Sequence, residues 1–496
     1  MKKIKYILLS LSVLLLFSAC EKEFLDTFPT TQVSAADALG STQNAYAALN
    51  GVHRLLYQQF NTQGSQGHAG EGSINLFRDY LGEDIVFPRP GGSTGYVGVL
   101  RWQSHRNVND GTLRYVYRFY YQVISNVNVL INGIDDTPGA PEDIAIIKGQ
   151  SLAYRAWAHF QLVQLWGRRY EGGTTNSQLG VPLLLENTLV GQPRATVEAV
   201  YAQINADLDE ASKLLPVYNR TGSAAKSNID ANVVQGIRAR VALVQQRWAD
   251  AAAAAVAARQ GYPLMSNDAY LAGFNDITNP EWIWGSRQIS DHNTFFWSYF
   301  AYNSANFNST VLRTQPRAIN ANLWEAIPDT DIRKQCWDLT GATVPIPPGG
   351  ARVPYQNKKF LAASSSLSIG DVVMMRAAEM YLIEAEAKAR LGDDAGARQA
   401  LFELVSNRDS EYTLSTNSGQ ALIDEIMFNR RIEFWGEGFR FTDLKRTDSP
   451  MIRTGIPNHV PALIFVAEVP AGDEQWQWLF PQDEINTNPS MVQNPL

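Results

Sequence analysis

Two stretches of this sequence are similar to each other, and each is typical of two helices joined by a short turn. The first covers residues 231–261 and turns at Trp248, Ala249 and Asp250. The second covers residues 372–408 and turns near Gly392. Both place a helix rich in small residues against a second helix, and alanines let helices approach closely. The chain is therefore constrained to pack helices in pairs.

Four further segments carry apolar residues at helical spacing and predict helices. They are residues 35–60, 112–134, 144–166 and 197–215. Together with the two similar stretches they make roughly four pairs joined by turns, which is how tetratricopeptide units pack. We expect a mainly α fold, a tetratricopeptide-like scaffold of helical pairs. On the second stretch, Glu384 with Lys388 and Glu386 with Arg390 predict a solvated helix face, because side chains four residues apart are neighbours.

Two regions depart from the helical pattern. Residues 64–98 are rich in glycine, which permits tight turns and disfavours a regular helix, so we interpret them as loops that face a ligand or a partner. Residues 262–370 are rich in Asn, Ser, Thr, Pro and aromatic residues. A stretch of that length is too long for a plain connection in a compact domain. We expect a loop-rich, aromatic-rich ligand-binding subdomain here.

These patterns divide the chain into a leader, a tether and one large domain. The domain covers residues 35–496, and its last segment is expected to pack on the rest because chain ends need contacts to be ordered. The expected parts are a signal peptide over 1–19, a tether over 20–34, a helical scaffold over about 35–60, 112–261 and 371–446, a binding region over about 61–111 and 262–370, and a packing segment over 447–496.

The amino terminus has the pattern of a secretion signal. Three lysines within the first five residues precede an apolar run over residues 7–17, which is too short to cross a membrane as a helix. Ser18 and Ala19 lead into Cys20, which resembles the lipidated cysteine of bacterial lipoproteins, although Phe17 departs from the usual aliphatic residue. The alternative is ordinary cleavage. Several acyl chains on Cys20 would form a stable anchor. The acidic residues that follow resemble the tract that directs such lipoproteins to the cell surface; they are Glu21, Glu23 and Asp26.

Composition excludes several classes of function. The formal net charge of −7 argues against a nucleic-acid-binding protein, which normally carries a basic stripe. The chain has two cysteines, Cys20 and Cys336, so lipidation of the first would leave the second without a partner for a disulfide. The six histidines are scattered without a close pair. We therefore expect neither a protein-built metal site nor a cofactor.

Candidate ligand residues come from the aromatic-rich and glycine-rich regions. Sugar recognition needs flat apolar faces for the rings and planar polar groups for the hydroxyls. Residues 282–306 and 78–107 are the densest supply of both. For any one aromatic, the alternative is a place in the core or in a partner interface. The predicted ligand-binding residues are Trp102, Trp297 and Tyr299, with Arg78, Tyr96, Asn107, His292 and Asn303.

Catalytic interpretations find little support. A glycosidase needs two carboxylates about 5–9.5 Å apart across a cleft. Glu83 with Asp84, and Asp329 with Asp331, are candidates only because carboxylates are common. Adjacent carboxylates in a strand point to opposite faces, and residues 329–333 are typical of a polar turn. No serine-nucleophile motif or phosphate-binding glycine loop is present, so we expect no enzyme.

Residues 429–446 mix charged and aromatic side chains within a few turns of the expected helical pattern. The sequence is NRRIEFWGEGFRFTDLKR. Arg430, Glu433, Glu437 and Arg440 are spaced by three, four and three residues, so on one helix they form a ladder of neighbours. A ladder pressed against aromatic rings predicts a partly buried ion-pair network. The alternative is a polar binding site.

The spacing of this stretch resembles the carboxyl-terminal signature of the SusD/RagB family. Segments 155–160, 180–183 and 476–486 also resemble that family. Its members are surface-exposed outer-membrane lipoproteins that capture nutrients, mostly glycans, for a TonB-dependent transporter. The signature residues, to which we assign a structural role, are Arg430, Glu433, Glu437, Arg440, Asp443 and Arg446.

The resemblance implies a protein that binds an oligosaccharide without chemical change. It further implies a SusC-like TonB-dependent outer-membrane transporter as partner, with the membrane contacted through the lipid anchor alone. Peptide capture in the same kind of system is an alternative, and two others are a surface glycan hydrolase and a scaffold that binds only protein. The residues themselves indicate only a tethered, acidic, helix-rich protein.

Overall fold

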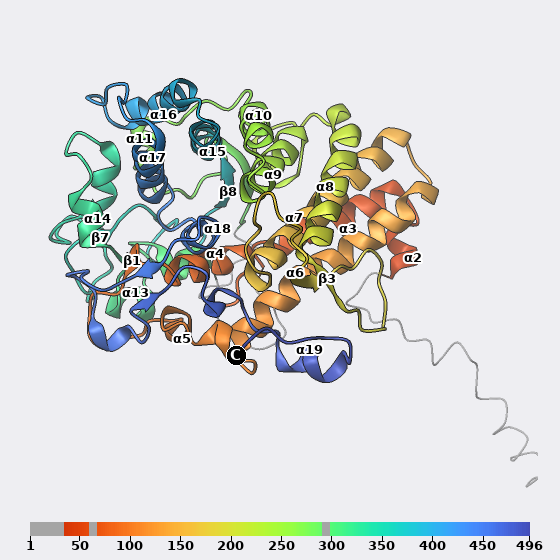
Figure 1. The fold of residues 1–496 in the computed structure, drawn as a ribbon, viewed down its shortest axis with the longest axis horizontal. Coiled ribbons are helices and arrows are strands. Elements are labelled where there is room, and N and C mark those ends of the chain that lie inside the picture. Colours follow the sequence, from red (N-terminus) through yellow and green to blue (C-terminus); the bar gives the residue numbers. More distant parts are fainter. Residues whose placement is uncertain (1–33, 59–66, 290–297) are drawn as a thin grey trace, which may run out of the picture.

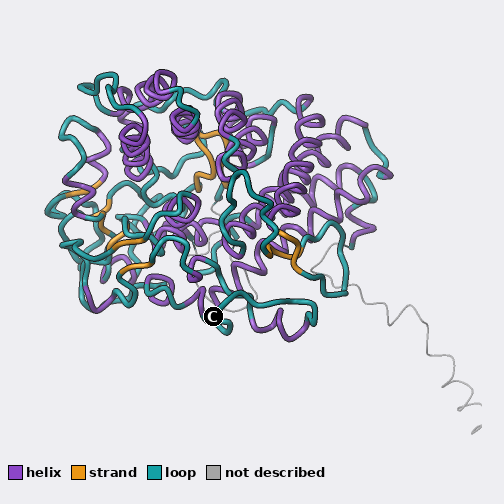
Figure 2. The backbone as a smooth tube through the Cα atoms, viewed as in Figure 1, coloured by secondary structure: helices purple, strands orange, loops and turns teal. Residues whose placement is uncertain are grey.

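The computed structural model describes residues 34–58, 67–289 and 298–496. Helices fill much of the upper and right-hand parts of the molecule in Figure 2, while several short strands lie at the lower left and others lie near the centre. The helices are α2 (Ala35–Ala38), α3 (Thr42–Leu55), α4 (Gly70–Tyr80), α5 (Val97–Leu100), α6 (Gly111–Gly133), α7 (Pro141–Trp166), α8 (Val197–Leu214), α9 (Ala231–Val244), α10 (Trp248–Ala258), α11 (Asn267–Tyr270), α12 (Tyr299–Asn303), α13 (Thr310–Thr314), α14 (Ala321–Glu325), α15 (Ala377–Arg390), α16 (Asp394–Arg408), α17 (Gly419–Glu433), α18 (Arg440–Arg446) and α19 (Gln482–Thr487).

The long helices form a continuous array in which each packs on the next. α6 packs on α7, α7 on α8, α9 on α10, α10 on α15 and α15 on α16 (Figure 1). The two similar stretches of sequence are the hairpins α9–α10 and α15–α16, and they meet through the alanine-rich faces of α10 and α15. Ala255 of α10 and Ala387 of α15 are both fully buried and belong to the same core cluster. The fold is mainly helical and tetratricopeptide-like, as expected.

Polar residues at the amino-terminal ends explain where several of these helices begin. The side chain of Asp110 accepts hydrogen bonds from the backbone at the start of α6, and Thr196 does the same for α8. Asp230 caps α9 and Asp393 caps α16. Such caps satisfy backbone donors that have no partner within the helix. The expected boundaries of α6, α7 and α8 therefore agree closely with the structure.

The glycine-rich region contains a buried helix, so the expectation of loops is wrong for α4. Every residue of Gly70–Tyr80 is buried. Gly70 has a φ of +57°, and a β-carbon there would meet the backbone of Leu56. A β-carbon on Gly72 would lie 3.0 Å from Cβ of Tyr299. These glycines permit close packing of a central helix rather than exposed turns.

Residues 372–376 are also not helical. They form the buried strand β8 (Val372–Arg376), which pairs antiparallel with β4 (Trp282–Ser286), and α15 begins only at Ala377. β-branched residues favour a pleated, packed surface, which explains the strand. The remaining strands are β1 (Ile85–Val86), β2 (Leu179–Pro182), β3 (Arg194–Thr196), β5 (Ala318–Ile319), β6 (Trp337–Asp338), β7 (Gln356–Asn357), β9 (Met451–Ile452) and β10 (Glu468–Val469), with β1, β5, β7 and β6 in one antiparallel sheet.

The predicted pairs on α15 exist, but the helix face that carries them is not solvated. Glu384 binds Lys388 and Glu386 binds Arg390, yet the two carboxylate side chains are only 6% and 0% exposed. Glu384 also binds Arg259 of the neighbouring hairpin. The spacing predicted the pairs correctly, whereas their burial depends on neighbouring elements that a local pattern does not reveal.

The end of the chain packs back onto the helical array. The backbone of Trp478 donates to the carbonyl of Leu165, and that of Leu479 donates to His105. Trp478 and Phe480 are buried. In Figure 1 the carboxyl end lies beside α5.

Candidate functional site

The signature stretch is not one helix, so its ladder does not form as expected. α17 ends at Glu433, and α18 begins at Arg440. Between them Gly436 and Gly438 have φ values of +81° and +90°, a left-handed conformation that favours glycine. The chain therefore turns sharply, and the charged side chains point to partners on other elements.

Glu433 lies at the centre of a buried ion-pair network. Its carboxylate accepts hydrogen bonds from Arg376 at 2.6 Å, Arg333 at 3.1 Å and Arg408 at 3.3 Å. Burial alone would raise the pKa of Glu433, but the three guanidinium groups outweigh it and hold the pKa well below its usual range. The expectation of a partly buried ion-pair network is confirmed.

Glu437 extends the network to β8 and the loop region. It accepts from Lys359 at 2.7 Å and from two nitrogens of Arg376 at 2.8 and 2.9 Å. Each of the network's side chains is at most 3% exposed. The network joins four cations, Arg333, Lys359, Arg376 and Arg408, to four carboxylates, Glu281, Asp331, Glu433 and Glu437. Its formal charge is zero, which is what a water-excluded cluster requires.

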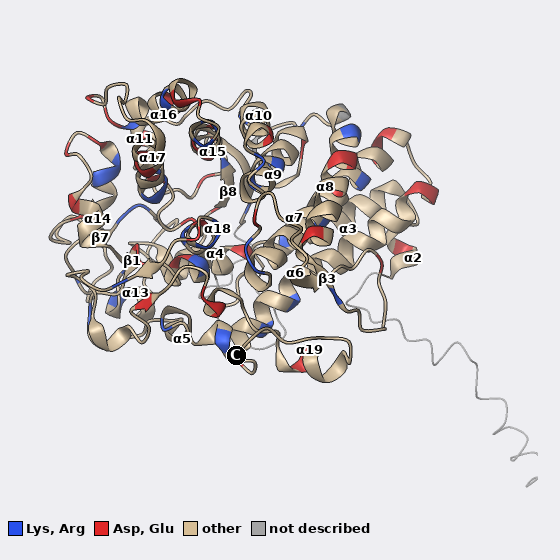
Figure 3. Cartoon of the chain, viewed as in Figure 1, with Lys and Arg blue, Asp and Glu red and all other residues tan. Residues whose placement is uncertain are grey.

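The remaining signature residues also bind charged partners. Asp443 accepts from Arg430 at 2.7 Å and from Arg446 at 2.8 Å. Arg446 also donates to both oxygens of Glu386, each at 2.7 Å. Burial would raise the pKa of Glu386, but Arg446 and its neighbours lower it to about 2. This cluster connects α18 to α15 and α17, and Figure 3 shows acidic and basic residues close together around α4 and α18.

The carboxylates considered for a hydrolase are held by arginines. Arg440 Nε donates to Glu83 at 3.0 Å, and Arg431 Nε donates to Asp84 at 3.1 Å. Asp331 is buried and binds Arg333 at 2.6 Å. An acid or base in catalysis must exchange a proton with its substrate. Each of these three carboxylates is already paired with a guanidinium group.

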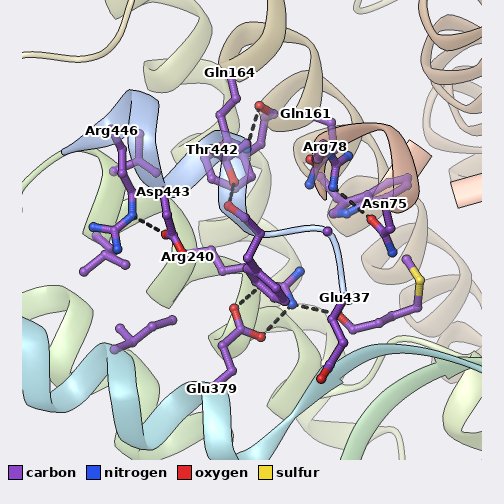
Figure 4. Close-up of a pocket in the computed structure, with 18 of the residues that line it drawn as sticks. Asn75, Arg78, Gln161, Gln164, Arg240, Glu379, Glu437, Thr442, Asp443 and Arg446 are labelled. Atoms are coloured by element: carbon purple, nitrogen blue, oxygen red, sulfur yellow. Dashed lines mark hydrogen bonds and ion pairs between the residues drawn. The ribbon is translucent and has the colours of Figure 1, made fainter. Parts of the chain in front are cut away.

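A small polar cavity lies beside the signature, between α4, α7, α9 and α18. Figure 4 shows the guanidinium of Arg240 facing the carboxylate of Glu379, with which it makes two hydrogen bonds of 2.6 Å. The cavity has a volume of about 60 Å³. Sites for small organic ligands are roughly 300–1,000 Å³. This cavity accommodates a few water molecules and excludes a sugar chain.

Several predicted ligand residues lie in the interior. Arg78 on α4 donates to Glu71 at 2.8 Å and to the hydroxyl of Tyr120 at 2.5 Å. Tyr96 donates to the carbonyl of Gly67 at 2.6 Å, and its ring lies 4.7 Å from that of Tyr302. The glycine-rich segment and the aromatic-rich segment therefore converge here. In this structure their rings face each other rather than solvent.

Tyr299 and Asn303 contact the signature turn. The Tyr299 hydroxyl donates to the carbonyl of Gly436 at 2.5 Å and accepts from Asn303 at 2.7 Å. Tyr299 is 5% exposed and Asn303 is fully buried. These two side chains hold α12 against the end of α17. His292 and Trp297 lie outside the residues that the structure describes.

Trp102 and Asn107 line a different feature, an open groove at the lower edge of the molecule. The groove has a volume of about 1090 Å³ and lies between residues 98–110 and the loop 465–475. The Trp102 ring is 2% exposed, packs against Trp476 and donates to the carbonyl of Leu81 at 2.9 Å. Asn107 is exposed at the rim. Trp102 thus supports the floor of the groove.

Sequence reasoning did not single out Phe465, which also lines this groove and is 71% exposed. It lies in the segment 447–496, which was expected to pack on the rest of the domain because chain ends need contacts to be ordered. Leu463 and Val469 are indeed buried. The exposure of a single ring within such a stretch produces no periodic pattern in the sequence by which it could be predicted.

Comparison with known families identifies the chain. A model described as the SusD family matches residues 275–496. A second model, described as starch-binding associating with outer membrane, matches residues 95–243. The chain belongs to the SusD family. The residues that resembled this family lie within or next to the matched segments, and the resemblance is confirmed.

Individual SusD-like proteins align over nearly the whole chain. SusD-like protein P38 of Formosa agariphila is 22% identical, over 90% of this chain and 92% of that protein. A SusD-like carbohydrate-binding protein from Bacteroides vulgatus is 28% identical, with a TM-score of 0.80 over 91% of this chain and 98% of its own. A laminarin-binding SusD-like protein is 21% identical, with a TM-score of 0.70 over 92% and 99%.

These matches place the protein among SusD-like carbohydrate-binding proteins. In residues 34–58, 67–289 and 298–496, no helix is long and apolar enough to cross a membrane. In the same part of the chain, no group of three or more His, Cys, Asp or Glu side chains is arranged to hold a metal ion.

Proposed function

We infer that this SusD-like protein captures an oligosaccharide at the cell surface without changing it chemically. It then delivers the ligand to a SusC-like TonB-dependent outer-membrane transporter. The observation that carries this proposal is the match of both halves of the chain to SusD-family models, one of which is described as starch-binding associating with outer membrane. The laminarin-binding relative with the same fold supports a glycan as the ligand class.

A non-catalytic role agrees with the chemistry of the described residues. Glu83, Asp84 and Asp331 each bind an arginine, so they do not form a free acid and base that face each other across a cleft. Recognition of hydroxyl groups needs amides, carboxylates and an aromatic face, and it needs no proton transfer.

A lipid on Cys20 would hold the protein at the outer membrane. Residues 20–34, the expected tether, would then connect that lipid to the domain. Trp297 and His292 remain proposed ligand contacts together with Asn107, and the buried Trp102, Tyr96, Tyr299, Arg78 and Asn303 would act by supporting the loops that carry them.

Two measurements on the tagged protein test the proposal. Purification from outer membranes should bring down a TonB-dependent barrel transporter, and the purified protein should bind a glycan array. If the protein bound peptides but not glycans, the proposed ligand class would be wrong. If it shortened a bound glycan, its function would be hydrolysis rather than capture. A protein that retains glycan but no transporter would disprove the delivery step alone.

A further inference from the structure

Phe465 differs from the other aromatic side chains of the protein in its exposure. Its ring is 71% exposed, whereas every other Phe, Tyr and Trp in residues 34–58, 67–289 and 298–496 is buried or half-buried. Removing an aromatic ring from water is strongly favourable. Single exposed apolar residues are nevertheless common, so the exposure matters only because of where the ring lies.

The ring lies on the wall of the groove of about 1090 Å³. This volume suits an extended ligand, since sites for smaller organic ligands span roughly 300–1,000 Å³. Trp102 and the residues beneath it are buried and therefore form a fixed floor. The other wall is the segment 98–110, which ends at the capped amino terminus of α6. The groove is thus built on the scaffold and not on a free loop alone.

Planar polar side chains line the same groove as the ring. Gln103 and Asn107 are exposed at one wall, and Glu474 is exposed at the other. The amide oxygen of Asn107 accepts from the backbone of Asn109 at 3.1 Å, which orients the group. Amides both donate and accept, so they match sugar hydroxyls, and carboxylates accept from them. A flat apolar face flanked by such groups is the chemistry that a pyranose ring requires.

The charges of the groove favour a neutral ligand. Its lining holds two arginines, Arg101 and Arg106, and three acids, Asp110, Asp473 and Glu474, a formal sum of −1. The arginines are moreover engaged by the walls: Arg101 donates to the carbonyl of Ala462, and Arg106 donates to those of Glu474, Gln477 and Pro495. A polyanionic chain would need a positive lining to attract it.

We propose that this groove binds a neutral oligosaccharide, with Phe465 as the ring on which a sugar stacks and Gln103 and Asn107 as partners of its hydroxyls. The assignment rests on the proposed function, because it specifies where the captured glycan binds and its charge class. It assigns a role to a part of the chain that the signature does not include.

The test is titration calorimetry of the intact protein with a panel of neutral oligosaccharides, including laminarin fragments, and with an anionic uronate polymer such as alginate. Phe465→Ala should weaken binding of the neutral ligand by about tenfold, because an aromatic stacking contact contributes roughly 0.5–1.5 kcal/mol. Phe465→Trp should retain it. Asn107→Ala should also weaken binding. Leu414→Ala is the matched control, because Leu414 is 50% exposed on a different loop.

The outcomes separate this assignment from the function on which it rests. If the parent protein binds glycan and both Phe465→Ala and Asn107→Ala bind it with unchanged affinity, the groove is not the binding site. The proposal of glycan capture would then still stand. Failure of the parent protein to bind any glycan overturns both. Tighter binding of the uronate polymer than of every neutral glycan overturns the charge class. Since Phe465 and Asn107 are exposed, both variants should unfold at the parent temperature, and a lowered temperature would show that the side chains serve structure.

Discussion

Arg376 and Glu437 form a two-pronged ion pair in the interior of the protein. Arg376 Nε lies 2.9 Å from Glu437 Oε2, and Nη2 lies 2.8 Å from Oε1. The two side chains are 1% and 3% exposed. Arg376 ends β8 and Glu437 lies in the turn between α17 and α18, so the pair joins the central strand to the family signature. Its removal should therefore affect stability before it affects ligand binding.

The first prediction is that Glu437→Ala destabilises the protein severely. The substitution leaves Lys359 and Arg376 with less compensating charge in a buried place, and breaking a buried pair costs about 3–5 kcal/mol. Urea denaturation should show this loss as a lower midpoint. Glu210→Ala is the control, because Glu210 is 46% exposed where it binds Lys213, and exposed pairs contribute about 1 kcal/mol or less. Equal losses in the two variants would contradict the account.

The second prediction concerns the turn that breaks the signature helix. A β-carbon on Gly438 would lie 2.6 Å from Cβ and 2.7 Å from Cα of Asn75 on α4. Gly392 has a similar φ, +82°, but its β-carbon would meet nothing within 4 Å. Gly392→Ala should cost only the left-handed backbone penalty, about 1–2 kcal/mol. Gly438→Ala should lower the thermal unfolding temperature clearly further, and similar shifts would show that α4 yields to the added methyl group.

These cases show what a local pattern predicts and what it does not. The helices α6 and α8 were predictable because each keeps one apolar period over many turns and begins at a capping side chain. α4 was missed because Gly70 and Gly72 are typical of turns. In the structure these glycines instead let the helix approach Leu56 and Tyr299 closely. Gly436 and Gly438 broke the expected ladder. A glycine looks the same in the sequence whether it ends a helix or lets a helix pack closely. Which of the two occurs depends on the element, distant in sequence, that approaches the glycine.

The candidate site was predictable in chemistry and only partly in place. The sequence singled out Trp102 and Asn107 as ligand-binding residues, which stays a prediction, and both line the large groove. It did not indicate that the Trp102 ring is covered by Trp476, since this contact spans most of the chain. Phe465 was missed because it lies in the segment 447–496, which was expected to pack on the domain as chain ends do.

The third prediction is that stability falls as the pH is lowered below about 6.5, the usual pKa of histidine. Burial lowers the pKa of His53, His105, His159 and His459 to about 3, and that of His68 to about 4. The unfolded chain therefore binds protons between pH 6.5 and about 4 that the folded chain does not, which favours unfolding. The contribution of the neutral histidines to stability is complete above pH 6.5. It decreases as the pH falls from 6.5 toward the pKa values that these histidines have in the folded protein.

Several carboxyl groups modify this trend. Glu386, whose pKa is about 2, contributes stability above its usual pKa, and that contribution is lost as the pH falls from 4.5 to 2. Burial raises the pKa of Asp79 to about 7, so Asp79 acts in the opposite direction between pH 7 and 3.8. Burial also raises the pKa of Glu71, Asp230 and Asp371, so four carboxyl groups oppose the five histidines and make the loss of stability smaller. Urea midpoints at several pH values should show a shallower dependence in His159→Gln, and an unchanged slope would contradict the assignment for that residue.

The fourth prediction concerns the anchor. Cys20→Ala should move the protein from the membrane fraction to the soluble fraction, because the acyl chains that hold it would be missing. Cys336→Ser should stay with the membrane, since Cys336 is a buried free thiol in the domain. Fractionation followed by immunoblotting measures both. If Cys20→Ala stayed in the membrane fraction, attachment through this cysteine would be disproved.

The account's central claim is that the family signature holds the scaffold together while the ligand binds elsewhere, in the groove that Phe465 lines. The most direct test measures unfolding temperature and glycan affinity in the same two variants, Glu437→Gln and Phe465→Ala. We predict that Glu437→Gln unfolds at a lower temperature and binds with parent affinity where it remains folded, whereas Phe465→Ala unfolds normally and binds about tenfold more weakly. Loss of binding in Glu437→Gln at unchanged unfolding temperature would contradict the claim.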